Sequence, residues 1–290
     1  MRDYQIQSSY RNIEKLKGIY IYACSKDVEV IKPGNVNIDY PHSDTTAYDF
    51  LRSAHDSCKS LFKQDFSLGE RIYYSVSDSR KNTKVNTNLG ILILIAPIIH
   101  SLLNSTKTTF RSALKDVIKT SQISDTNLLC RAINFVNPGG LGERERMSTN
   151  SLPKVTLKTI MDESANYDRL SYQYSTGYSD ILDFIVPRII EHKKYIENTD
   201  FLLSLVFLEI LSEIPDTHIS RKFNEKIAKK TSNEACDLIK IINTERSRKK
   251  ALSRICQLDY EYKNKGINPG TTADLLLSGV MIERLLCSDL

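Results

Sequence analysis

The sequence predicts an all-α protein, folded as a single bundle-like domain of about ten helices that spans residues 1–290. Apolar residues recur at steps of three and four through most of the chain, as one face of a helix requires. Alternating, strand-like patterning is confined to a short run at 71–76. With 290 residues, 41% of them hydrophobic, the chain is long enough to bury a large core.

Helical spacing begins near the N-terminus, where Ile6, Tyr10, Ile13, Leu16 and Tyr20 fall on one face. Three polar stretches between the periodic segments are expected to be loops: 75–84, 143–153 and 216–221. The same spacing predicts amphipathic helices over 46–62, 110–119, 156–174, 179–192, 226–242 and 273–286.

Two strongly apolar runs, 89–99 and 201–214, are expected to form buried helices. Each is too short to span a bilayer, and Pro97 and Glu209 interrupt them. The N-terminus carries no secretory pattern. The six cysteines include no C-x-x-C pair, so we expect reduced, buried thiols and no zinc site. Together these features predict a cytoplasmic protein without a membrane partner.

The net charge of +5 is mild, and only residues 246–250 form a basic stretch. This stretch is either the solvated face of a helix or a phosphate-contacting patch for a nucleotide or RNA. The first interpretation is favoured, so nucleic acid is not an expected partner. The sequence is compatible with an oligomer without specifying one.

Four short turns concentrate the residues that bend a chain tightly. They hold six of the eleven glycines and three of the eight prolines, and each adds Asn, Thr or Lys. A plain reversal of direction does not need repeated Asn, so these turns are expected to present N–H groups and amides to an anionic ligand. The alternative for each turn alone is a simple connection. The turns are 32–36 (KPGNV), 86–90 (NTNLG), 137–142 (NPGGLG) and 268–274 (NPGTTAD).

The last turn, 268–274, combines these features at the expected start of a helix. Pro269 extends the residue before it, and Gly270 permits a bend. Thr271 or Thr272 can then cap a helix whose free N–H groups face the turn. Asp274, in the first helical turn, could hold a cation or complement the helix dipole.

Charged residues elsewhere suit a Mg²⁺-bound polyphosphate. Asp168 stands next to a basic residue, and Arg221 and Lys222 follow an Asp-Thr-His sequence. Carboxylates hold a hard cation, while bases neutralise phosphate oxygens. The competing interpretation is that these charges form capping or surface pairs.

Read in order, the motifs resemble the triphosphoribosyl-dephospho-CoA synthase family over residues 30–277. The resemblance rests on the four turns, on AP at 96–97, on the segment from Met161 to Tyr174 and on DTH at 216–218. It implies a helical enzyme that moves the triphosphoribosyl group of ATP onto a hydroxyl of 3′-dephospho-CoA, or of a related acceptor, and releases adenine. The product would be a prosthetic-group precursor for the acyl carrier protein of citrate lyase or malonate decarboxylase.

Displacement of adenine passes through an oxocarbenium-like state, which a carboxylate stabilises while an acid and a base handle protons. With the resemblance, this chemistry predicts His42, Asp44 and Asp168 as catalytic residues, and Asp44, Asp168 and Asp274 as ligands of Mg²⁺. ATP would be the co-substrate. The residues expected to bind it are Lys32, Gly34, Asn35, Asn86, Asn88, Asn137, Gly139, Gly140, Arg221, Lys222, Asn268, Gly270, Thr271 and Thr272.

Two other functions remain open at this point. One is a Mg²⁺-dependent hydrolase of nucleotide N-glycosidic bonds, and the other is a non-enzymatic nucleotide- or RNA-binding module. The transferase interpretation depends on one geometric expectation, namely that the distant turns meet in a single pocket lined with acids and bases.

Overall fold

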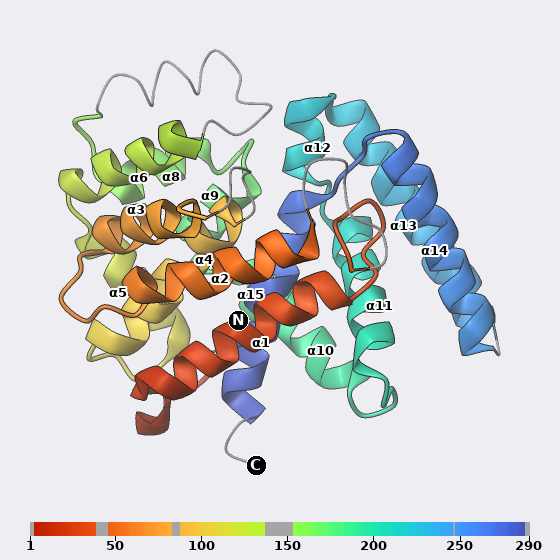
Figure 1. Cartoon of the computed structure of the whole chain (residues 1–290), viewed down its shortest axis with the longest axis horizontal. Coiled ribbons are helices and arrows are strands. Elements are labelled where there is room, and N and C mark those ends of the chain that lie inside the picture. The colour runs from red at the N-terminus through yellow and green to blue at the C-terminus, as the bar shows by residue number, and fades with distance from the viewer. Residues whose placement is uncertain (1–2, 39–45, 83–87, 137–152, 246, 288–290) are drawn as a thin grey trace.

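The structure is a computed structural model that describes residues 3–38, 46–82, 88–136, 153–245 and 247–287. Within these ranges the regular elements are helical, apart from an isolated β-bridge between Gln5 and Thr109. The all-α prediction is therefore confirmed. Helix α15 (Gly270–Cys287) runs through the middle of the molecule, with α3, α5, α6 and α8 on one side and α11 to α14 on the other (Figure 1).

The described residues form fourteen α-helices, more than the ten expected from the sequence. Their order is η1 (Ser8–Arg11), α1 (Ile13–Glu29), α2 (Ala47–Leu61), α3 (Leu68–Ser79), α4 (Leu89–Asn104), α5 (Phe110–Thr120), α6 (Ile123–Val136), α8 (Leu157–Ser164), α9 (Arg169–Thr176), the π-helical segment η2 (Asp180–Ile185), α10 (Val186–His192), α11 (Thr199–Glu213), α12 (Thr217–Lys222), α13 (Glu225–Thr244), α14 (Arg248–Asn264) and α15.

The short run at 71–76, whose alternation is strand-like, is part of α3. Ser67 and Glu70 form a reciprocal capping box that starts the helix. The buried residues Leu68, Ile72 and Val76 then recur every four positions, which is helical spacing. The expected loop at 75–84 begins inside this helix for the same reason.

The expected loop at 216–221 is also helical and forms most of α12. Asp216 caps it by accepting a hydrogen bond from the N–H of Ile219 at 3.0 Å. The long helix expected over 156–174 is two helices, α8 and α9, with Asp168 capping the second. The expected loop at 143–153 lies outside the described residues up to 152.

Two tyrosines complete the hydrogen bonding of the buried helix α4. Pro97, inside this helix, has no N–H to give the carbonyl of Ile93. The hydroxyl of Tyr174 donates to that oxygen at 2.6 Å, and the hydroxyl of Tyr178 donates to the carbonyl of Leu94 at 2.8 Å. The AP pair and Tyr174, both part of the family-like pattern, therefore support the fold here.

Among the described residues, none of the helices combines the length and the apolar character needed to cross a membrane. Helices α4 and α11 are buried along most of their length, as expected. All six cysteines are free thiols, although only Cys24 and Cys130 are fully buried.

Candidate active site

The helices α4, α9, α12 and α15 begin close to one another, although their first residues are separated by up to about 180 positions in the sequence. The positive end of each helix dipole therefore points into the same region. The contacts that establish this convergence link α15 to α12, α12 to α9, and α15 to α4.

Asp216 joins the starts of α12 and α15. Its side chain is buried, and besides capping α12 it accepts hydrogen bonds at 2.8 Å from both the N–H and the hydroxyl of Thr272. The hydroxyl of Thr271 accepts the N–H of His218 at 3.2 Å and lies 3.2 Å from the hydroxyl of Thr217. Thr271 and Thr272 are thus inside the first turn of α15 rather than capping it, because the helix already starts at Gly270.

Helix α9 meets the same region through Asp168. One carboxylate oxygen accepts a hydrogen bond from Arg221 at 2.6 Å, and the other accepts the N–H and the hydroxyl of Ser171, each at 2.8 Å. The N–H of Arg169 donates to the hydroxyl of Thr217 at 3.3 Å. Asp168 therefore acts as a helix cap and as the partner of Arg221, with both oxygens engaged.

The carboxylate of Asp274 lies against the start of α4. A Cβ atom at Gly90 would collide with Asp274 Oδ2, so only glycine leaves room for the carboxylate at this position. Asn88 precedes α4 without capping its first N–H groups and instead donates to the carbonyl of Phe50 at 3.3 Å. The last turn and the described part of the second turn, 88–90, are therefore neighbours in space.

Burial raises the pKa of Asp274 well above its usual value of 3.8, and the negative charges of Asp27 and Asp216 raise this pKa further. The positive charges of Lys32 and Arg221 act in the opposite direction without cancelling the effect. Among the described residues, the structure gives the Asp274 carboxylate no hydrogen bond. Asp274 is partly exposed, and a carboxyl in this state fits a bound cation or a proton-transfer role.

The first turn, 32–36, also reaches this region. Lys32 is fully buried and forms an ion pair with Asp27, the acidic residue one turn earlier at the end of α1. The side-chain amide of Asn35 donates to the side-chain oxygen of Asn268 at 2.9 Å. This contact connects the first turn directly with the last.

His218 contributes an imidazole beside the last turn. A Cβ atom at Gly270 would lie 3.6 Å from its ring. Burial lowers the pKa of His218 below 6.5, and the nearby positive charges of Arg221 and Lys222 add to this, whereas Asp216 opposes it. The ring is therefore neutral at pH 7 and able to accept a proton.

The structure thus brings together the described members of three of the four turns, with Asp168 and Arg221. Lys222 lies at the edge, where its ammonium group donates to the carbonyl of Gly266 at 3.0 Å. The rest of the predicted site lies outside the described residues, so the fourth turn is not placed. These residues are His42, Asp44, Asn86, Asn137, Gly139 and Gly140.

Sequence reasoning missed Asp27, included Gly90 only as part of the second turn, placed His218 behind His42 as an acid or base, and treated Asp216 only as part of a motif. The signal for Asp216 was available, since Asp followed by a helix is a common cap. Asp27 gave no such signal, because its role comes from contacts with residues distant in the chain. Within the described parts of the chain, no cluster of three metal-ligating side chains is preformed.

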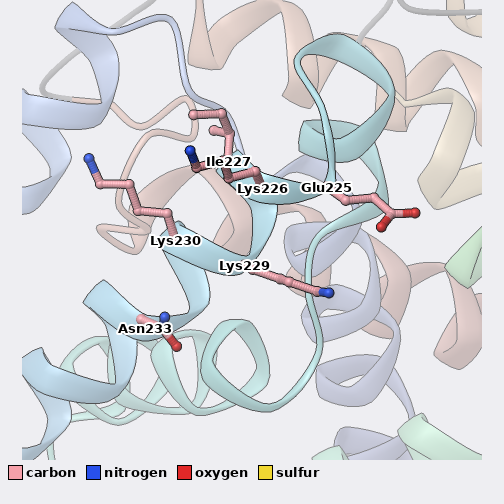
Figure 2. Close-up of a pocket in the computed structure, with 6 residues that line it drawn as sticks. All are labelled: Glu225, Lys226, Ile227, Lys229, Lys230 and Asn233. Carbon is pink, nitrogen blue, oxygen red and sulfur yellow. The ribbon is translucent and has the colours of Figure 1, made fainter.

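A surface hollow of about 620 Å³ lies elsewhere, over the first turns of α13. Figure 2 shows that its side chains diverge, with Glu225 and Lys229 pointing to one side and Lys230 to the other. Such an arrangement does not gather charge around one ligand, so this hollow is not a second candidate site. Its lining residues are Glu225, Lys226, Ile227, Lys229, Lys230 and Asn233.

The basic stretch at 246–250, which suggested nucleic-acid binding as an alternative function, is described from residue 247 onward. Lys249 and Lys250 are exposed in the first turn of α14. This fits the solvated helix face that the sequence favoured.

Residues 13–289 match the model of the CitG family, which is described as ATP:dephospho-CoA triphosphoribosyl transferase. Among solved structures, a protein of Archaeoglobus fulgidus with the provisional name triphosphoribosyl-dephospho-CoA synthase is similar with a TM-score of 0.62. The match is 18% identical and covers 80% of this chain and 97% of the other, so it concerns the fold. No curated protein sequence matches the chain.

Proposed function

The chain belongs to the ATP:dephospho-CoA triphosphoribosyl transferase family, and we propose how its residues divide the work of that reaction. The enzyme transfers the triphosphoribosyl group of ATP to a hydroxyl of dephospho-CoA and releases adenine. The observation that carries the proposal is the convergence of four helix N-termini around Arg221 and Asp274.

The triphosphate is the handle by which the donor is held. Arg221 has 26% of its side chain exposed, pairs with Asp168 at the start of α9 and acts electrostatically on Asp274 near the start of α15, so it is suited to bind a phosphate oxygen directly. The N-terminus of α4, which the side chain of its N-cap residue Asn88 does not cap, offers N–H groups to the same anion. Lys32 is completely buried in its ion pair with Asp27, so it acts electrostatically on Asp274 rather than by contact with a phosphate.

Asp274 fits a magnesium ligand better than Asp168 does. Its carboxylate has no hydrogen bond among the described residues, and its pKa is raised first by burial and then by the negative charges of Asp27 and Asp216, which a cation would offset. Both oxygens of Asp168 are taken up by Arg221 and Ser171. A Mg²⁺ ion held by Asp274 and the triphosphate would neutralise phosphate charge. Asp44, outside the described residues, stays the predicted carboxylate at the anomeric carbon.

We propose His218 as the base that receives the proton of the acceptor hydroxyl. Its neutral imidazole lies beside Gly270, at the start of α15, and so borders the triphosphate-binding region. The sequence assigned this role to His42, which lies outside the described residues and stays a prediction.

The transferase is tested by incubating the protein with ATP, Mg²⁺ and 3′-dephospho-CoA, then measuring free adenine and the mass of the product. The expected product carries the intact triphosphoribosyl group on the acceptor, and adenine forms only when the acceptor is present. Adenine release from ATP alone, at the same rate, would instead identify a hydrolase. We place the reaction in the cytoplasm, with small-molecule substrates and no nucleic acid.

A further inference from the structure

Asp259 is buried on α14, yet it holds a turn that lies 225 residues earlier in the sequence. One carboxylate oxygen accepts the N–H of Gly34 at 2.8 Å. The other accepts the ammonium group of Lys263 at 2.8 Å and the side-chain amide of Asn37 at 3.4 Å. Because a buried carboxylate requires partners of this kind, the arrangement is a built contact and not a chance encounter.

The held turn has little freedom to adapt. Gly34 has φ = +83°, a conformation that side-chain-bearing residues rarely adopt. A Cβ atom there would collide with the carbonyl oxygen of Ile267 and would lie 3.0 Å from Cβ of Tyr262. The turn is thus fitted between α14 and the segment that leads into α15.

The two ends of the turn lead to the active site. Lys32, at one end, pairs with Asp27 and acts electrostatically on Asp274. Asn35, at the other, donates to Asn268, just ahead of α15. Asp259 itself contacts neither Asp274 nor Arg221 in any hydrogen bond or ion pair that the described structure contains.

We infer that Asp259 is a positioning residue for the triphosphate subsite, which sets the place of Lys32 and Asn35 by clamping Gly34 and Asn37 to α14. This inference rests on the proposed function. A displaced turn weakens the binding of the triphosphate in the ground state and the transition state alike, and such a loss raises KM while leaving kcat in place.

The test compares wild type with Asp259→Asn, which keeps the shape of the side chain and removes its charge. Glu261→Gln on the same helix is the matched control, because Glu261 is 44% exposed and pairs only loosely with Lys265 at 3.9 Å. For Asp259→Asn, we expect KM for ATP to rise about tenfold, as for a lost charge-assisted hydrogen bond. We expect kcat and KM for dephospho-CoA to change less than about threefold.

A purely structural role would lower the melting temperature without changing KM for ATP, and that result in folded Asp259→Asn overturns the inference. If this variant does not fold, Lys263→Gln carries the same test, since it removes only one donor to Asp259. Unchanged KM for ATP in folded Lys263→Gln then counts against the clamp.

Binding of inorganic tripolyphosphate, measured by calorimetry, separates this inference from the proposed function. Wild type that binds tripolyphosphate, with about tenfold weaker binding in Asp259→Asn, supports the inference even if no adenine is released. Adenine release together with unchanged tripolyphosphate affinity in Asp259→Asn leaves the transferase standing and removes Asp259 from its subsite.

Discussion

Asp125 and Asp274 both lie beside a glycine at the start of a helix, but their surroundings differ. Around Asp125, the carboxylate accepts hydrogen bonds from the Ser67 hydroxyl at 2.7 Å and from the N–H groups of Gly69 and Gln122 at 2.8 and 2.7 Å. Around Asp274, the described residues supply no hydrogen bond, and burial together with two further carboxylates raises its pKa. A buried charge whose hydrogen bonds are satisfied stabilises a fold, whereas a carboxylate without such bonds among its described neighbours indicates a site for a ligand.

The largest loss of activity is expected from Asp274→Asn. Loss of the carboxylate proposed to hold Mg²⁺ against the triphosphate should reduce kcat/KM for adenine release by about 10³-fold, as for other strong electrostatic contacts in an active site. Steady-state assays with ATP and dephospho-CoA measure this. Activity within tenfold of wild type, in a folded variant, would remove Asp274 from the site.

His218→Gln should come next, with a loss of about 10²-fold, typical of a removed general base. The pH profile adds a directional test. Because the pKa of His218 is lowered from 6.5, the neutral base persists below pH 6.5, and wild-type kcat/KM should fall only at more acidic pH. This acidic limb should disappear in His218→Gln. If His218→Gln retains the acidic limb of the pH profile, another residue is the base, and His42 is the next candidate.

Paired glycine substitutions sharpen the comparison. Gly90→Ala pushes on the Asp274 carboxylate, so kcat/KM should fall about 10²-fold, as a small misplacement of a group that positions the substrate can cause. Gly69→Ala pushes on the backbone of Asp125 and should instead cost about 1–3 kcal/mol of unfolding free energy. Urea unfolding and initial rates, measured for both variants, show whether each substitution affects stability or activity. The same effect from both substitutions would erase the distinction between the regions.

Asp125→Asn should leave the activity of the folded enzyme unchanged. One of its two side-chain ends would then present an amide to an N–H donor, which should reduce the unfolding free energy by about 1.5–3 kcal/mol. Urea denaturation measures the loss, and specific activity per folded molecule is the control. A large loss of activity in the folded fraction would make this region part of the site.

The smallest expected effect is a gain in stability from Asp274→Asn. A raised carboxyl pKa means that the folded state holds its proton more tightly, so wild-type stability falls as pH rises above 3.8. The amide has no proton to lose, and the variant should be about 1–2 kcal/mol more stable at pH 7. The gain should vanish near pH 4. Lower stability at pH 7 would show that the carboxylate is satisfied after all.

The fold class followed from sequence periodicity, because helical spacing is a local property of residues such as Leu68, Ile72 and Val76. The run at 71–76 is helical because the capping box of Ser67 and Glu70 outweighs a brief alternation. Composition singled out the four turns, of which 137–142 lies outside the described residues. That these turns lie close together in space could not be derived from the sequence, because no local pattern specifies which helix start a distant carboxylate will reach.

The roles of single residues were harder to predict for a related reason. Asp168 reads as a metal ligand in the sequence, but in the structure its oxygens are used by Arg221 and Ser171. Lys32 reads as an exposed phosphate ligand, yet it is completely buried against Asp27. Residue type indicates what chemistry is available, and only packing shows whether that chemistry is already in use.

Hydrogen exchange with bound ATP tests the convergence itself. If the helix starts form one triphosphate site, ATP should slow exchange of the first-turn amides of α4, α9 and α15 together, because one anion contacts or orders all of them. The first turn of α3, beside Asp125, should exchange at an unchanged rate. Protection confined to the first turn of α13, or to only one of the three helix starts, would contradict the account.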